Sequence, residues 1–159
     1  MEYSLDAVDW KWLTGLHSTR ARIDALLGEG TPDGVMESYD LDWNMGGVMA
    51  FETWDALETV AGEADDKRYA RLVLAAFAPL MSGEPKYDEL NLADESSGCF
   101  YASLSPPTVA VVAQAMSQLD LEKLAEEIGL EDSLEWLRQR AAVVYLARDR
   151  GWGLVAHAG

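Results

Sequence analysis

The hydrophobic pattern is clearest in residues 96–119, a stretch without a charged side chain. Large and small residues alternate over Phe100–Leu104, which is typical of a half-buried strand. Ser105 then fits the N-cap of a helix, and Pro106 fits its first position, where the missing N–H costs nothing. The apolar residues that follow at helical spacing are Val109, Val112, Ala113 and Met116. The pattern predicts a strand, a tight junction and a mostly buried helix.

Five further segments have the apolar periodicity of amphipathic helices, bounded by capping residues. The first runs over residues 5–27, with Ser4 or Asp6 as its N-cap and a break at Gly15 that would give two helices. Residues 86–98 are expected to form a long irregular connection. The remaining predicted helices are residues 48–60, the segment from Asp65 or Asp66 to Met81, the segment from Asp120 to Gly129, and the segment from Asp132 or Ser133 to Gly151.

The last of these helices is followed by a predicted strand at residues 152–158, in a small sheet with Phe100–Leu104. At 159 residues, of which 49% are hydrophobic, the chain is long enough to bury a sizeable core. The predicted fold is a single α+β domain over residues 1–159, predominantly helical with a small β-sheet. The arginines of the last helix are expected outside or near its C-terminus, where positive charge suits the helix dipole; they are Arg138, Arg140, Arg148 and Arg150.

The net charge of −16 is unevenly distributed along the chain. Residues 31–66 contain ten acids and no lysine or arginine, and residues 120–135 contain seven acids against Lys123. An acidic surface disfavours direct binding to nucleic acid or to an anionic membrane. It would instead steer a basic protein partner toward the chain.

We therefore hypothesise that residues 31–66 form a partner-binding face. Aromatic side chains would supply anchors and carboxylates would pair with arginine or lysine. The proposed binding residues are Tyr39, Asp40, Asp42, Trp43, Glu52, Trp54 and Asp55. In the open alternative, the aromatic rings turn inward and the acids only keep the protein soluble.

Two function classes follow from this charge layout. The favoured one is a non-enzymatic acidic interaction protein that binds a basic protein partner and neutralises it, as toxin-immunity proteins do. The alternative is a small enzyme with an acid-rich cleft. The first is favoured because the sequence contains no ordered catalytic motif.

The histidines and the cysteine give little support to the alternative that the chain is an enzyme. Neither His17, His157 nor the single Cys99 has the spacing of a zinc site, so we predict no catalytic residues, no metal and no cofactor. The first ten residues, MEYSLDAVDW, lack the basic and apolar regions of a signal peptide. A lone cysteine also suits a reducing compartment, and we expect a cytoplasmic protein.

The second half of the chain is similar to the YfbM-like family, a group of small bacterial proteins of unknown function. The resemblance rests on the helix RYARLVLAAFAPLMSG at residues 68–83, the strand-to-helix turn YASLSPPTVAVVAQAM at residues 101–116, the final helix, and the strand LVAHAG at residues 154–159. It implies a mixed α/β bacterial domain and supplies no catalytic residues.

One acidic segment has the beginning of a calcium loop. Asp40-x-Asp42-x-Asn44 matches its first ligands, but Met45 stands where the loop needs glycine, and Phe51 stands where it needs glutamate. A carboxylate-rich turn is therefore the favoured interpretation.

We predict that neither Ca²⁺ nor Mg²⁺ binds saturably at Asp40 and Asp42, because two required positions of the loop are missing. Titration followed by calorimetry and by thermal shift measures this. Saturable micromolar binding that disappears in Asp42→Ala would contradict the prediction and favour the enzyme.

Overall fold

The computed structural model describes residues 3–28, 30–40, 48–96 and 99–158. Within them, antiparallel strands form one sheet in the order β2-β1-β4-β3. The strands are β1 (Tyr3–Val8), β2 (Met36–Asp40), β3 (Phe100–Leu104) and β4 (Gly153–Ala158). The helices are α1 (Trp10–Gly15), α2 (Thr19–Leu26), α3 (Val48–Glu63), α4 (Lys67–Met81), the 3₁₀ turn η1 (Pro85–Tyr87), α5 (Leu92–Glu95), α6 (Pro106–Ser117), α7 (Leu121–Ile128) and α8 (Ser133–Arg150). The predicted α+β class, mostly helical with a small sheet, is confirmed.

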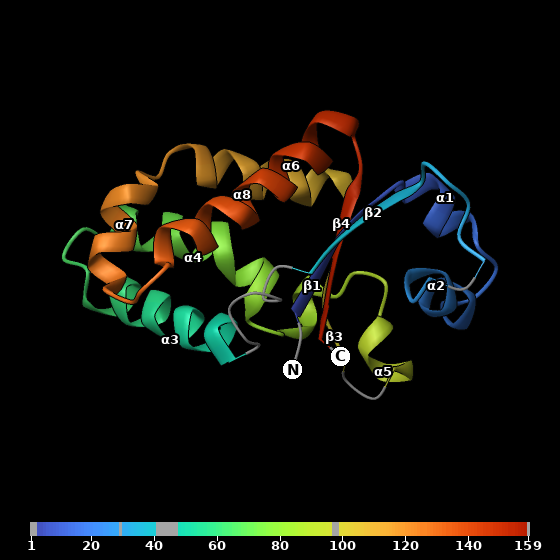
Figure 1. Ribbon diagram of the computed structural model, residues 1–159, viewed down its shortest axis with the longest axis horizontal. Helices are drawn as coiled ribbons and strands as arrows, with labels where there is room; N and C mark the ends of the chain where they lie inside the picture. The colour runs from blue at the N-terminus through green and yellow to red at the C-terminus, as the bar shows by residue number, and fades with distance from the viewer. Residues whose placement is uncertain (1–2, 29, 41–47, 97–98, 159) are drawn as a thin grey trace.

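The sheet lies between two helical layers of unequal size (Figure 1). Helices α3, α4, α6, α7 and α8 pack on one face, where Tyr3, Leu5 and Ala7 of β1 join the larger hydrophobic core. Helices α1, α2 and α5 cover the other face, where Val8 and Val155 join a smaller core. Because successive side chains of a strand point to opposite faces, β1 contributes to both cores.

The predicted strand, junction and helix in the middle of the chain are confirmed by β3 and α6. Ser105 stands at the N-cap, but within the described chain its side chain caps no backbone N–H. Its hydroxyl instead donates to Oε1 of Glu89 at 2.8 Å, and its backbone N–H donates to Oε2 at 2.7 Å. Glu89 therefore anchors the junction from outside the helix.

The helix predicted over residues 5–27 is wrong at its beginning. Ser4 and Asp6, the expected caps, lie inside β1, which pairs with β2 on one side and with β4 on the other. Leu5 and Val8 have helical spacing, but they also suit opposite faces of a strand that is buried on both. The conformation is determined by pairing with distant strands, which a local sequence pattern does not show.

Helical structure begins after β1 and is divided as predicted. Asp9 caps α1, because its carboxylate accepts from the N–H groups of Lys11 and Trp12. The helix ends at Gly15, and Ser18 caps α2 by accepting from the N–H of Ala21.

Residues 86–98 contain more regular structure than predicted, since they include part of η1 and the whole of α5. The buried carboxylate of Asp88 organises this connection. It accepts from the backbone N–H groups of Leu92 at 3.0 Å and Ala93 at 2.9 Å, and from the hydroxyl of Ser103 at 2.7 Å.

The prediction that Arg140 lies on the outside of α8 is wrong, because its side chain is fully buried. Its guanidinium carbon is 3.7 Å from the centroid of the Trp136 ring and 5.1 Å from that of Tyr3. A guanidinium is weakly hydrated and stacks on aromatic faces, so these rings make its burial possible. Arg138, Arg148 and Arg150 are exposed, as predicted.

Strand β4 begins at a glycine because its neighbours leave no room for a side chain. A Cβ at Gly153 would collide with the ring of Trp10 and lie 2.6 Å from the carbonyl oxygen of Leu104. The indole of Trp10 can therefore cover this end of the sheet.

Residues on the apolar faces of α4, α6 and α8 lie together in the larger core. Leu72 is partly buried there, and the others are buried: Phe77, Val109, Val112, Leu137 and Val144.

Phe77→Ala should lower the free energy of unfolding by about 3–5 kcal/mol, because it removes a fully buried ring and leaves a cavity. The ring also packs against Trp136, with 6.0 Å between centroids. Urea unfolding measures the change. The control is Leu74→Ala in the same helix. It also shortens an apolar side chain, but Leu74 is 38% exposed. A loss below about 1 kcal/mol for Phe77→Ala would contradict its place in the core.

Candidate functional site

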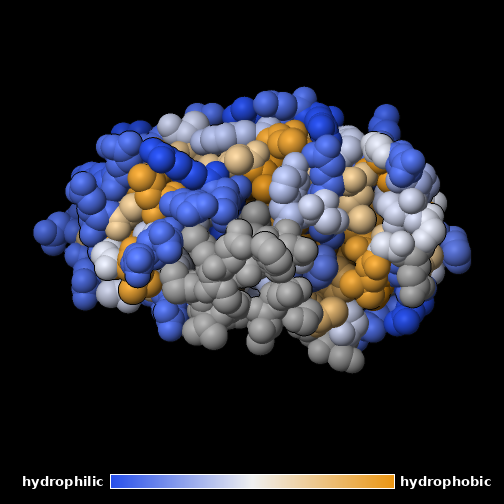
Figure 2. All heavy atoms as spheres, in the orientation of Figure 1, coloured by the Kyte–Doolittle hydropathy of each residue, from blue (hydrophilic) through white to orange (hydrophobic). Residues whose placement is uncertain are grey.

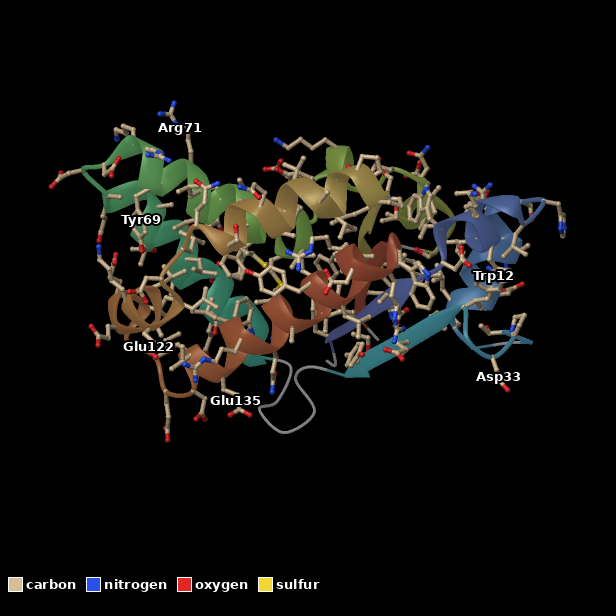
Figure 3. The ribbon with its side chains drawn as sticks, turned by 90° about the horizontal axis from the view of Figure 1, so that it is seen from above. Trp12, Asp33, Tyr69, Arg71, Glu122 and Glu135 are labelled. Atoms are coloured by element: carbon tan, nitrogen blue, oxygen red, sulfur yellow. The ribbon has the colours of Figure 1, made fainter. Side chains whose placement is uncertain are left out.

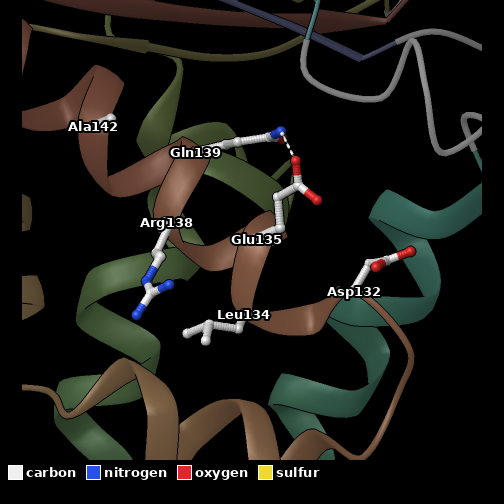
Figure 4. A pocket seen from close by; sticks show the side chains of 6 residues that line it. All are labelled: Asp132, Leu134, Glu135, Arg138, Gln139 and Ala142. Carbon is white, nitrogen blue, oxygen red and sulfur yellow. Dashed lines mark hydrogen bonds between the residues drawn. The ribbon is translucent and has the colours of Figure 1, made fainter.

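A shallow groove runs along the exposed side of α8, and Figure 4 shows its middle part. It consists of three adjoining hollows of about 380, 630 and 220 Å³. Leu134 lines the first two, and Ala142 lines the last two. This α8 groove extends from the junction of α7 and α8, past Gln139, to Tyr39 on β2.

The floor of the α8 groove is largely apolar. Leu134, Ala142 and Leu146 are separated by multiples of four residues, so they lie on one side of α8. The opposite side of the helix, with Trp136 and Val144, is buried in the larger core. Hydrophobic side chains consequently lie between hydrophilic ones along α7 and α8 (Figure 2).

The rim of the groove is acidic. Among its described lining residues are the carboxylates of Glu122, Glu126, Asp132 and Glu135, against the single guanidinium of Arg138. Nη2 of Arg138 donates to Oε1 of Glu122 at 3.2 Å, an exposed ion pair that contributes little to stability. Figure 3 shows Glu122 and Glu135 at the same end of the molecule. The described charges that line this part of the groove therefore sum to a net negative charge.

The other end of the groove is fixed by a hydrogen-bonded group on β2. The hydroxyl of Tyr39 donates to Oε2 of Glu37 at 2.7 Å, and Nη2 of Arg150 donates to Oε1 at 3.1 Å. The hydrogen bond from Tyr39, followed by that from Arg150, lowers the pKa of Glu37. The bond to Glu37 raises the pKa of Tyr39. Tyr39 is thus held against α8 with its ring in the groove.

The structure describes the side chains of four of the sequence-predicted binding residues. Tyr39 lines the α8 groove, while Glu52 and Asp55 are exposed on α3. Trp54 is only 7% exposed and belongs to the larger core, so its assignment as a surface anchor is corrected. Asp40 is the last residue of β2, and nothing further is described of its side chain.

Asp42 and Trp43 lie outside the described residues. Helix α3 packs against α7, whose residues line one end of the α8 groove. Glu52 and Asp55 thus lie on a helix that is packed against one wall of the groove.

Sequence reasoning missed most of the α8 groove, including Glu126, Leu134 and Glu135. The seven acids of residues 120–135 were a usable signal, and Leu130 among them is 37% exposed. The pattern did not show that α7 and α8 meet in a way that leaves Leu130 exposed and Leu134 only half-buried. That arrangement depends on the tertiary packing of both helices.

Comparisons with protein-family models, with curated proteins and with solved structures found no match to this chain. The resemblance to the YfbM-like family therefore stays a prediction. No helix in the described part of the chain is both long and apolar enough to cross a lipid bilayer. Nor does that part contain a group of three or more histidine, cysteine or acidic side chains placed to hold a metal ion.

We expect Tyr39→Phe to raise the pKa of Glu37 toward its ordinary value, because it removes the hydrogen bond that lowers this pKa most. A pH titration of the side-chain carboxyl ¹³C signal of Glu37 measures the effect. Tyr145→Phe, which changes a tyrosine of α8 whose ring lies against Arg148, should leave this pKa unchanged. An unchanged pKa in Tyr39→Phe would show that the Tyr39–Glu37 hydrogen bond is not made in solution.

Proposed function

We propose that this chain is an acidic interaction protein that binds a basic protein partner through the α8 groove and the adjoining acids of α3. The observation that carries the proposal is the combination of an apolar floor, with Leu134 and Ala142, and a rim of unbalanced carboxylates. A segment that presents an apolar stripe between lysines or arginines would match both parts.

The two parts of the groove have different roles in this proposal. The carboxylates would steer the partner and select against acidic proteins, while apolar contact would supply most of the affinity. The Glu122–Arg138 ion pair is exposed, so an incoming arginine can replace Arg138 at small cost. The net charge of −16 adds a long-range attraction at low salt.

We further propose that the partner is a toxin, neutralised when the acidic surface covers its basic residues. Binding is favoured over the alternative of an enzyme with an acid-rich cleft for a physical reason. The rim carboxylates are exposed to water and can pair with lysine or arginine side chains of a partner, whereas catalytic carboxylates commonly lie partly buried in a cleft. A resemblance to the YfbM-like family adds no residue roles to the proposal.

The test is capture of the partner from cells that contain the chain naturally, followed by calorimetry with the purified, identified partner. Binding should weaken at least tenfold between about 0.05 and about 0.5 M salt, since salt screens exposed charges. The double variant Glu126→Lys/Glu135→Lys should abolish binding without lowering the melting temperature, because both side chains are exposed.

Two further double variants test which acidic residues outside the groove contribute to binding. Asp94→Lys/Glu95→Lys makes the same charge change on α5, in the opposite helical layer, and should retain binding. Glu52→Lys/Asp55→Lys should weaken binding to a smaller extent, because these acids only adjoin the groove. Unchanged binding after reversal in the groove, or a partner that is not basic, would overturn the proposal.

A further inference from the structure

A second pocket, of about 250 Å³, lies on the other face of the sheet, beside the end of α2. Its polar lining residues are Ser4, Asp6, Ser38 and His157. The apolar part of its lining includes Leu26, Leu27 and Met36. Among the residues that the structure describes, this pocket shares no lining residue with the α8 groove.

Strand pairing explains why these polar residues meet. In the antiparallel register, Asp6 is opposite Ser38 on β2, and Ser4 is opposite His157 on β4. Directly opposed side chains lie on the same face of a sheet, as do residues two apart on one strand. The four side chains therefore share one face, although Asp6 and His157 are far apart in the sequence.

The buried group in this pocket is the carboxylate of Asp6, whose residue is only 1% exposed. Its Oδ2 accepts from Nε2 of His157 at 3.0 Å. Its Oδ1 is buried and has no hydrogen-bond partner among the described residues. A buried carboxylate oxygen without a donor is destabilising, and a ligand with an N–H group would remove that penalty.

The surroundings of Asp6 favour a donor that carries positive charge. The pocket lies beside Leu26, Leu27 and Gly28 at the C-terminal end of α2, which is the negative end of the helix dipole. Met36 and the leucines provide an apolar wall against which a short alkyl chain can pack. Leu27 is 56% exposed, so its side chain can move aside to admit a ligand without disrupting the core.

We propose that this pocket binds a small primary alkylammonium ion, with its ammonium group donating to Asp6 and its alkyl chain against Leu27 and Met36. Ser38 also lines the pocket, and its hydroxyl can accept a further hydrogen bond from the ammonium group. Binding of the alkylammonium ion is independent of protein binding at the α8 groove, because the two sites lie on opposite sides of the sheet.

The probe is n-butylammonium, and the readout is the imidazole NMR signals. The chain has two histidines, and His17 is exposed away from the pocket, so it provides an internal control. The signals of His157 should shift saturably, with a dissociation constant on the order of 1 mM for so small a ligand. Those of His17 should not shift. Neutral n-butanol, and sodium chloride at equal ionic strength, should leave both unchanged.

Variants test whether Asp6 is the carboxylate that accepts from the ammonium group. Asp6→Asn should weaken binding at least tenfold, while Asp24→Asn, the same chemical change on α2 outside the pocket, should not. If Asp6→Asn does not fold, Ser38→Phe decides: it fills the pocket from an exposed position on the edge strand and should also weaken binding tenfold. Absence of a His157 shift, an equal shift with butanol, or unchanged binding in the pocket variants would overturn the proposal.

Discussion

Strand β1 has a pairing partner on each edge and a helical layer on each face, so its side chains and its backbone are covered together. Tyr3 shows how much depends on this position. Its hydroxyl donates to the carbonyl oxygen of Leu80 at 2.8 Å, and its ring lies against the guanidinium of Arg140. One residue of the first strand therefore positions both α4 and α8. Because α8 carries the acidic groove, the geometry of that groove depends on β1 as well.

Local patterns were sufficient for the helices whose ends are set by capping residues. Asp66, Asp120 and Gly129 bound α4 and α7 as the sequence predicts, because a cap is a contact between near neighbours. The same reasoning failed for β1, whose conformation is determined by pairing with distant strands. It failed for Arg140 because a charge is assigned to the surface by default, and only Trp136 one turn earlier hinted at a stacked arginine.

The candidate sites differ in the same way. The acidity of the groove could be read from composition, and Tyr39 was identified from an aromatic residue among acids. The burial of Trp54 was not predicted, because a buried and an exposed tryptophan look alike in a helical pattern. The pair of Asp6 and His157 could not be found from the sequence, because its distance depends on the register of β1 with β4.

The pairing of β1 with β4 also has a consequence for synthesis. Tyr3 pairs with Ala158, so nearly the whole described chain must be translated before β1 obtains its second partner. At ribosomal rates of roughly 5–20 residues per second, β1 waits on the order of 10 s. During that time one of its edges is open, and an open apolar edge recruits strands from other chains. The risk of aggregation of the nascent chain is thus set by the position of β4 in the sequence, independently of the stability of the finished fold.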